Sequence, residues 1–139
     1  MDYLYITFDP AKRPDGIHAL TSEYVETFWL PSLGPSAILL LRLLGRIYEP
    51  LALTSPQAQT SISISTLAGS LGLGLRGGIS RNSRLGGAIE RLQYNRICEY
   101  TGPTSLTVAP YLPRLRQAQI ERLPDALQFV LNPPTEVHV

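Results

Sequence analysis

Hydrophobic and polar residues alternate at the start of the chain and then change to a helical spacing. In the segment DYLYITF, residues 2–8, the apolar residues Leu4, Ile6 and Phe8 alternate with Tyr3, Tyr5 and Thr7. This alternation predicts a half-buried strand. In GPSAILLLRLLGRIYEP, residues 34–50, the apolar positions 38, 41, 44 and 48 repeat at helical spacing. We therefore predict a central core helix that has Pro35 in its first turn and is stopped by Pro50.

Shorter elements are predicted on both sides of this helix. Residues 21–30, TSEYVETFWL, predict a short helix with Thr21 or Ser22 as its cap, ended by Pro31. Residues 51–61, LALTSPQAQTS, are interpreted as a loop. Residues 63–73, SISTLAGSLGL, predict a second short helix with Ser63 or Ser65 as its cap.

The second half of the chain predicts another helix, a hairpin and two terminal helices. Residues 83–95, SRLGGAIERLQYN, place Ser83 as a cap and Asn95 as a left-handed residue at the end of a helix. Its apolar stripe consists of Leu85, Ala88, Ile89 and Leu92. RICEY and SLTVA, joined by the turn TGPT, predict a hairpin. Two short helices, each with a proline at its start, are predicted in 113–123 and 124–131, before a frayed tail at 132–139.

Charge is distributed unevenly along the 139 residues, although the formal net charge is only +1. Residues 31–96 carry seven arginines against two glutamates, a local charge of +5, whereas residues 1–30 carry a local charge of −3. The single Cys98 and the absence of a signal-peptide pattern favour a cytoplasmic protein. The longest apolar run is too short and too charged for a membrane span.

The glycine-rich segment 72–82, GLGLRGGISRN, contains the pattern G-x-G-x-x-G at Gly72, Gly74 and Gly77. A dinucleotide-binding loop requires a preceding strand, and an acidic residue about 20 positions further on. Here a helix is predicted before Gly72, and neither Asp nor Glu lies near position 97. No Lys follows the glycines as a phosphate-binding Walker A loop requires. We therefore interpret the segment as the connection between two helices, with no nucleotide cofactor.

The spacing Ile64-x-x-Leu67-Ala68-x-x-Leu71-Gly72, followed by the helix from Ser83 and the hairpin, resembles a winged helix-turn-helix domain. The resemblance covers residues 35–109 and implies an α+β, mostly α fold. Residues 1–34 are then an N-terminal extension of strand, turn and short helix, and residues 110–131 form C-terminal helices that pack on the domain or form a dimer interface. Residues 81–92 and 112–127 are similar to a group of small, mostly uncharacterised winged-helix proteins of high-GC bacteria and their phages. FWLPSLGPSAILLL also looks like the lead-in to the first helix in some bacterial replication-initiation winged helices.

This chain departs from the winged-helix pattern at two points. The connection between the two helices is about eight residues longer than the usual three or four. The wing tip, residues 101–105, lacks Lys and Arg. These departures weaken the expectation that the wing inserts into the minor groove.

In such a domain the N-terminal turns of the recognition helix enter the major groove, and flanking cations hold phosphates. We expect Arg84 to contact a guanine, with Asn82 and Ser83 as further donors. Arg76, Arg81 and Arg91 are expected to hold phosphates, and Thr104 is a further phosphate donor in the wing. The competing interpretation is that these arginines form a solvated face.

Other reactive residues do not form a recognisable site in the sequence. His18 and His138 have no partners at metal-ligand spacing, so no metal is expected. Cys98 is interpreted as a packing residue, and Phe28 and Trp29 as a hydrophobic plug under the core helix or part of a subunit interface. The N-terminal strand and the C-terminal helices are candidates for a dimer interface because the latter carry many apolar residues: Leu115, Ile120, Leu123, Leu127, Phe129 and Leu131.

The sequence therefore predicts a non-enzymatic, cytoplasmic winged helix-turn-helix protein without cofactor or metal. Its expected partners are double-stranded DNA and a second copy of the chain, and its expected role is transcription regulation. Plasmid or phage replication or partition is an open alternative. A different class of function is also open, namely a protein-interaction module that keeps the fold without a specific DNA site; Glu90 and the uncharged wing favour it.

Overall fold

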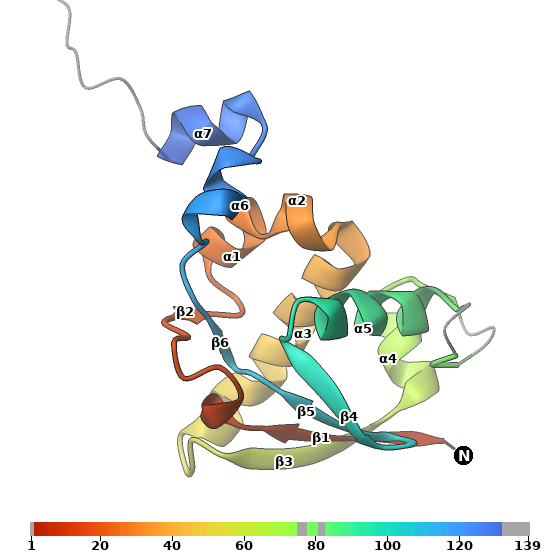
Figure 1. Cartoon of the computed structure of the whole chain (residues 1–139). Coiled ribbons are helices and arrows are strands. Elements are labelled where there is room, and N and C mark those ends of the chain that lie inside the picture. Colours follow the sequence, from red (N-terminus) through yellow and green to blue (C-terminus); the bar gives the residue numbers. More distant parts are fainter. Residues whose placement is uncertain (1, 75–77, 81–82, 132–139) are drawn as a thin grey trace, which may run out of the picture.

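A computed structural model of the chain describes residues 2–74, 78–80 and 83–131. A four-stranded sheet lies at one end of the molecule, α3 and α5 lie over it, and α6 and α7 lie at the far end (Figure 1). The predicted α+β class is confirmed. In chain order the elements are β1 Tyr3–Phe8, the 3-10 helix η1 Pro10–Lys12, β2 His18–Ala19, α1 Glu23–Phe28, α2 Leu30–Leu33, α3 Pro35–Ala52, β3 Ala58–Ser63, α4 Ile64–Ser70, α5 Arg84–Tyr94, β4 Cys98–Gly102, β5 Ser105–Val108, β6 Tyr111–Leu112, α6 Gln117–Glu121 and α7 Asp125–Leu131.

The predicted N-terminal strand is confirmed, and it occupies an inner position of the sheet. The strand order is β3-β1-β5-β4, with β1 antiparallel to β3 and parallel to β5. Leu4, Ile6 and Phe8 are buried in the same hydrophobic core as α3 and α5. Both edges of β1 are therefore paired, so this strand has no free edge with which to join a second copy of the chain.

β3 corrects the prediction of a loop over residues 51–61. The strand carries mostly small and polar residues, and its inward side shows only a weak apolar pattern at Ala58, Thr60 and Ile62. It forms because β1 supplies a hydrogen-bonding partner along its whole length, from Phe8 opposite Ala58 to Tyr3 opposite Ser63. Such pairing joins residues 50 to 60 positions apart and leaves little signal in the local sequence.

The core helix α3 is confirmed, and the four predicted positions 38, 41, 44 and 48 are buried. Its end was predicted incorrectly, because the helix continues through Pro50 to Ala52. Pro50 is exposed and lies in the last turn, so it interrupts the helix only near its end. Phe28 and Trp29 pack into the core beside this helix, as the plug interpretation predicts.

Side-chain caps define the starts of α1 and α4. Ser22 accepts a hydrogen bond from the Val25 amide at 3.2 Å, and Ser63 accepts one from the Thr66 amide at 3.0 Å. These contacts confirm one of the two candidates at each helix. α4 ends at a left-handed Gly72, φ +68°, with Leu73 N donating to Ala68 O at 3.0 Å, the Schellman arrangement.

The predicted hairpin is confirmed as β4 and β5, which pair antiparallel. The first C-terminal helix begins at Gln117, later than the predicted start at Pro113. Residues before it are held in an extended conformation by contacts with the body of the protein, such as Leu115 N to Tyr24 Oη at 2.9 Å. Leu115 and Leu123 are buried in the core, whereas Phe129 on α7 is 60% exposed.

Candidate nucleic-acid interface

The helix predicted from Ser83 is present as α5, and it turns one face inward and one outward. The apolar stripe of Leu85, Ala88, Ile89 and Leu92 is buried, as predicted. Beside this stripe Arg84 and Arg91 are exposed. Their spacing of seven residues is two helical turns, so the two guanidinium groups belong to one face.

Gly87 lies between these arginines and leaves the middle of the face without a side chain. A Cβ at Gly87 would meet no other atom within 4 Å. Arg91 Nη1 donates to the Ser32 carbonyl at 3.4 Å, a contact that directs the arginine towards α2. The outer face of α5 is thus a shallow surface with a cation near each end, and Tyr94, 87% exposed, follows at its C-terminal end.

The Ser83 hydroxyl, predicted to contact DNA, instead makes hydrogen bonds within the protein. It accepts a hydrogen bond from Gly86 N at 2.9 Å and lies 2.8 Å from the Ser80 carbonyl, to which it donates. The residue is only 9% exposed. Ser83 therefore caps α5 and has no hydroxyl hydrogen left for DNA.

Of the four other predicted contact residues, only Thr104 belongs to the part of the chain that the structure describes. Arg76, Arg81 and Asn82 fall outside the described residues. Thr104 lies in the β4–β5 turn, where its carbonyl accepts from Tyr5 N at 2.8 Å. This turn lies beside the N-terminal end of β1 (Figure 1), and Thr104 does not line the groove described next.

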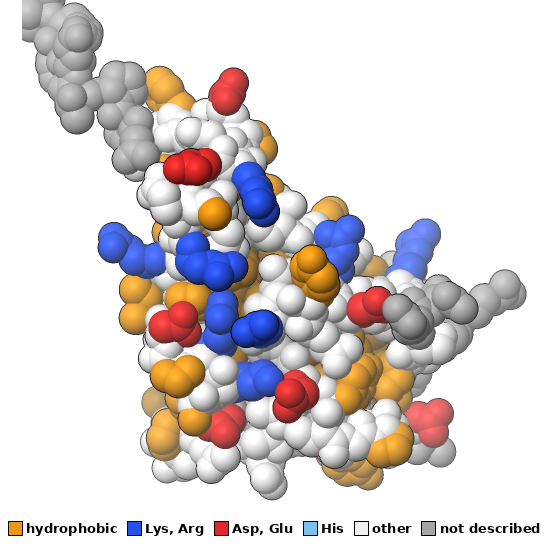
Figure 2. All heavy atoms as spheres, viewed as in Figure 1, with side chains coloured by type: hydrophobic (Ala, Val, Ile, Leu, Met, Phe, Trp, Pro, Cys, Tyr) orange, Lys and Arg blue, Asp and Glu red, His pale blue; other side chains and the backbone are white. Residues whose placement is uncertain are grey.

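A groove runs from the middle of α5, past its C-terminal end, to the loop after β1. It consists of three adjoining hollows of about 770, 380 and 700 Å³ that share lining residues, among them Tyr94, Asn95 and Arg96. We name it the basic groove because, among the described residues, seven cationic side chains line it: Lys12, Arg13, Arg91, Arg96, Arg114, Arg116 and Arg122. Figure 2 shows blue side chains gathered over this face of the molecule.

Acidic residues neutralise part of this charge. Asp15, Glu90 and Glu99 also line the groove, which leaves an excess of four positive charges. Lys12 Nζ lies 3.4 Å from Glu99 Oε2, and Arg13 Nε lies 4.0 Å from Asp15 Oδ1. The carboxylates of both pairs are well exposed to solvent, which weakens the pairs, so the cations remain available to an anionic partner.

Most of the groove cations were missed by the sequence analysis. Arg13 lies in the acidic N-terminal third of the chain, and Arg114, Arg116 and Arg122 lie in a C-terminal third with no net positive charge. The fold brings these segments to the C-terminal end of α5. A count of charge along the chain cannot detect such a cluster, because its members are about a hundred residues apart.

Arg96, rather than Asn95, is the left-handed residue after α5. Arg96 has φ +60°, whereas Asn95 has φ −91°. Asn95 instead donates from Nδ2 to the Arg91 carbonyl at 2.9 Å and closes the end of the helix. The prediction for Asn95 was therefore wrong by one residue, and the strained backbone belongs to an arginine that lines the groove.

The described residues offer little for nucleophilic or metal chemistry. Burial raises the pKa of the Cys98 thiol to about 12, so it stays protonated. Within residues 2–74, 78–80 and 83–131, no cluster of three or more His, Cys, Asp or Glu side chains is placed to hold a metal ion. None of the helices described here combines the length and the apolar composition needed to cross a bilayer.

The chain matches no protein-family model, no curated protein and no solved structure. Its function must therefore be inferred from the face of α5 and the basic groove.

Proposed function

We propose that this protein binds double-stranded DNA through the outer face of α5 and the adjoining basic groove, and that it acts in the cytoplasm as a transcription regulator. The observation that carries the proposal is the placement of Arg84 and Arg91 on one exposed face, with Gly87 between them. An α-helix with its side chains is about 10–12 Å across. The major groove is about 12 Å wide, so a helix such as α5 fits within it.

The basic groove supplies the second part of the interface. Its excess of positive charge continues from α5 over α6 and the loop after β1. Cations at these positions are suited to hold the phosphates that flank a helix lying in the major groove. Binding through them is sequence-independent, so sequence preference must come from α5.

The order of elements supports a winged helix-turn-helix arrangement. α3, β3, α4, α5 and the β4–β5 hairpin follow one another in the chain. β3 runs antiparallel to β1, and β1 runs parallel to β5, so β3 and the hairpin have the relative directions of a winged-helix sheet. The arrangement is unusual in that β1 lies between β3 and the hairpin. Because the turn at Thr104 carries no charge, we expect the DNA contacts to come from α5 and not from the wing.

A second copy of the chain is the proposed partner for reading two half-sites. The exposed apolar residues Phe129 and Val130 on α7 are the candidates for this contact. β1 cannot pair with a second copy of the chain at a sheet edge, because β3 and β5 already pair with its two edges.

A protein-interaction module is the competing function. Glu90 on α5 and the two other carboxylates of the groove favour it, because they would repel a phosphate backbone. A replication or partition factor would use the same DNA surface and is distinguished from a regulator by its target site.

The test is fluorescence anisotropy on a mixed-sequence duplex at several salt concentrations. The variant Arg84→Ala/Arg91→Ala is compared with Arg46→Ala, which removes an exposed arginine on α3 outside the groove. With four or five phosphates engaged, log affinity falls against log salt with a slope near −4. We expect the double variant to bind about tenfold more weakly or worse, with a slope reduced by about two, and Arg46→Ala to behave as the wild type. A wild type that does not bind at low salt would contradict the proposal and favour the interaction module.

A further inference from the structure

The central hollow of the basic groove, about 380 Å³ in volume, collects four arginines around a single tryptophan. The arginines come from the loop after β1, the turn after α5 and the segment before α6. One carboxylate, Asp15, shares the hollow with them, so the lining carries an excess of three positive charges. The four arginines are Arg13, Arg96, Arg114 and Arg116.

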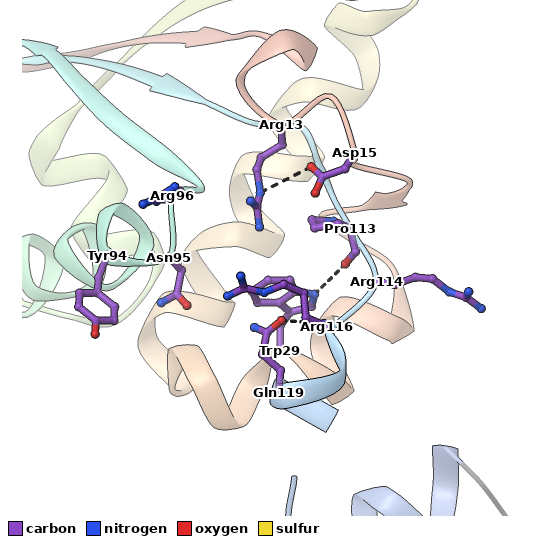
Figure 3. Close-up of a pocket in the computed structure, with 10 residues that line it drawn as sticks. All are labelled: Arg13, Asp15, Trp29, Tyr94, Asn95, Arg96, Pro113, Arg114, Arg116 and Gln119. Carbon is purple, nitrogen blue, oxygen red and sulfur yellow. Dashed lines mark hydrogen bonds and ion pairs between the residues drawn. The ribbon is translucent and has the colours of Figure 1, made fainter. Parts of the chain in front are cut away.

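Figure 3 shows how these side chains are directed. Arg13 and Arg116 extend into the hollow around Trp29, whereas Arg114 points away from it. Arg13 Nε is buried and has no hydrogen-bond acceptor among the described residues. Its nearest carboxylate oxygen, on Asp15, is 4.0 Å away, which is beyond hydrogen-bond distance. A buried charged donor without an acceptor is unfavourable, so the guanidinium of Arg13 gains from an anion held beside it in the hollow.

Arg96 reaches the hollow from an unfavourable backbone conformation. Its φ of +60° is a value that glycine or asparagine adopts more readily than arginine. The guanidinium of Arg96 therefore comes from a position whose backbone conformation favours glycine or asparagine over arginine. Together with Arg13 and Arg116 it provides guanidinium donors on different sides of one space.

The walls of the hollow are fixed by hydrogen bonds to the rest of the fold. Trp29 Nε1 donates to the Pro113 carbonyl at 3.3 Å, and Arg116 N donates to Gln119 Oε1 at 2.8 Å. The first contact joins the α1–α2 turn to the segment before α6, and the second closes the start of α6. A cationic hollow with fixed walls loses little conformational entropy when an anion binds.

We propose that this hollow binds a phosphate group, with Arg13, Arg96 and Arg116 as its ligands. Guanidinium groups donate paired hydrogen bonds to phosphate oxygens, and the bound anion relieves the repulsion among the arginines. The phosphate belongs either to the backbone of the DNA or to a free small molecule. Because the free form needs no DNA, the site goes beyond the proposed function and is testable separately from it.

Trp29 is the only tryptophan of the chain, so its fluorescence reports on this hollow alone. We would titrate the protein with inorganic phosphate, with a nucleoside 5′-monophosphate and with a mixed-sequence duplex, holding ionic strength constant with chloride. The main variant is Arg96→Asn, which removes the cation while asparagine tolerates the left-handed backbone. Arg116→Gln is a second variant, Arg46→Ala is the control outside the groove, and circular dichroism verifies that each variant is folded.

The expected result is a saturable change of Trp29 fluorescence in the wild type and Arg46→Ala, with affinity about tenfold lower or worse in Arg96→Asn and Arg116→Gln. Saturation by phosphate or the monophosphate identifies a free ligand, and saturation by the duplex alone identifies a backbone phosphate. The proposal is overturned if none of the probes saturates the signal, or if both variants bind as the wild type does. If anisotropy still detects duplex binding in that case, the phosphate site in the hollow is excluded and the proposed DNA function stands. If phosphate saturates the signal but the duplex does not bind, the DNA function is excluded and the phosphate site stands.

Discussion

Gly86 N donates a hydrogen bond of 2.9 Å to Ser83 Oγ, and this contact joins the first turn of α5 to the loop before it. The same turn brings Gly86 against the Ser80 carbonyl, so closely that a Cβ at Gly86 would overlap that oxygen. Gly87, one residue further on, has open space beside it. Two neighbouring glycines in one helix therefore have different structural roles.

The first prediction is that alanine has opposite effects at these two positions. Gly86→Ala must displace the backbone of Ser80 and is expected to lower the free energy of unfolding by about 2 kcal/mol or more. Gly87→Ala improves helix propensity without a clash and is expected to raise it by roughly 0.5–1 kcal/mol. Urea unfolding followed by circular dichroism measures both, and equal effects of the two substitutions would contradict this packing.

The second prediction concerns DNA affinity at Gly87. If the bare middle of the α5 face lies close to DNA, Gly87→Ala weakens duplex binding even though it stabilises the fold. Gly69→Ala is the matched control, because Gly69 also lies in a helix with open space beside it but on α4. Anisotropy titrations that give Gly87→Ala the affinity of the wild type would show that close approach does not occur there.

The third prediction is that the Ser83 cap makes a larger contribution than an ordinary cap. Loss of such a cap costs about 1 kcal/mol, and the Ser83 hydroxyl additionally donates to a loop carbonyl. We expect Ser83→Ala to lower the free energy of unfolding by about 2 kcal/mol, and more than Ser22→Ala at the start of α1. Thermal and urea unfolding of the two variants compares them directly, and a smaller loss at Ser83 would refute the added contribution.

The fourth prediction follows from the buried thiol of Cys98, whose Sγ lies 3.8 Å from the Ile89 carbonyl. Burial raises the pKa of Cys98 from its ordinary 9.0 to about 12, so the folded protein keeps a proton that the unfolded chain releases. The stabilising contribution is complete below about pH 9 and is lost as the pH rises towards 12. The loss is on the order of 1 kcal/mol per pH unit in that range.

Comparison with Cys98→Ala separates this contribution from that of Tyr48, whose pKa is also raised by burial and is common to both proteins. The pKa of Tyr100 is raised mainly by burial and in part by Cys98, so this coupling belongs to the difference between the two proteins. The difference in unfolding free energy between wild type and variant should fall between about pH 8 and about pH 10.5. The native thiol should also resist a thiol reagent at about pH 8 and react after denaturation. A difference independent of pH, or rapid labelling of the folded protein, would count against the buried thiol.

The fifth prediction concerns self-association through α7. Phe129→Ser removes an exposed aromatic side chain from the proposed contact and should shift the protein towards the monomer. Leu53→Ser is the control, because Leu53 is 87% exposed at the end of α3, away from α7. Light scattering coupled to size exclusion over a concentration series measures both, and an unchanged mass for Phe129→Ser would exclude this interface.

Local patterns were sufficient to predict much of the fold. The alternation at Leu4, Ile6 and Phe8 predicted β1, and helical spacing predicted the buried side of α3 and of α5. Each capping serine accepts a hydrogen bond from the backbone amide three residues later in the chain; the three are Ser22, Ser63 and Ser83. Such features involve residues only two to four positions apart, so the sequence contains their physical cause directly.

Contacts between distant segments decided the rest. β3 exists because β1 pairs with it, and neither its mostly polar residues nor its length predicts that partner. Trp29 and Arg116 belong to one hollow only because the segment before α6 returns to the α1–α2 turn. By itself the sequence determined the buried sides of α3 and α5, the capping serines and the shared face of Arg84 and Arg91, whereas it misplaced the end of α3 and the start of α6. The tertiary structure alone decided which arginines meet around Trp29, because their proximity depends on how the core packs and is independent of their separation along the chain.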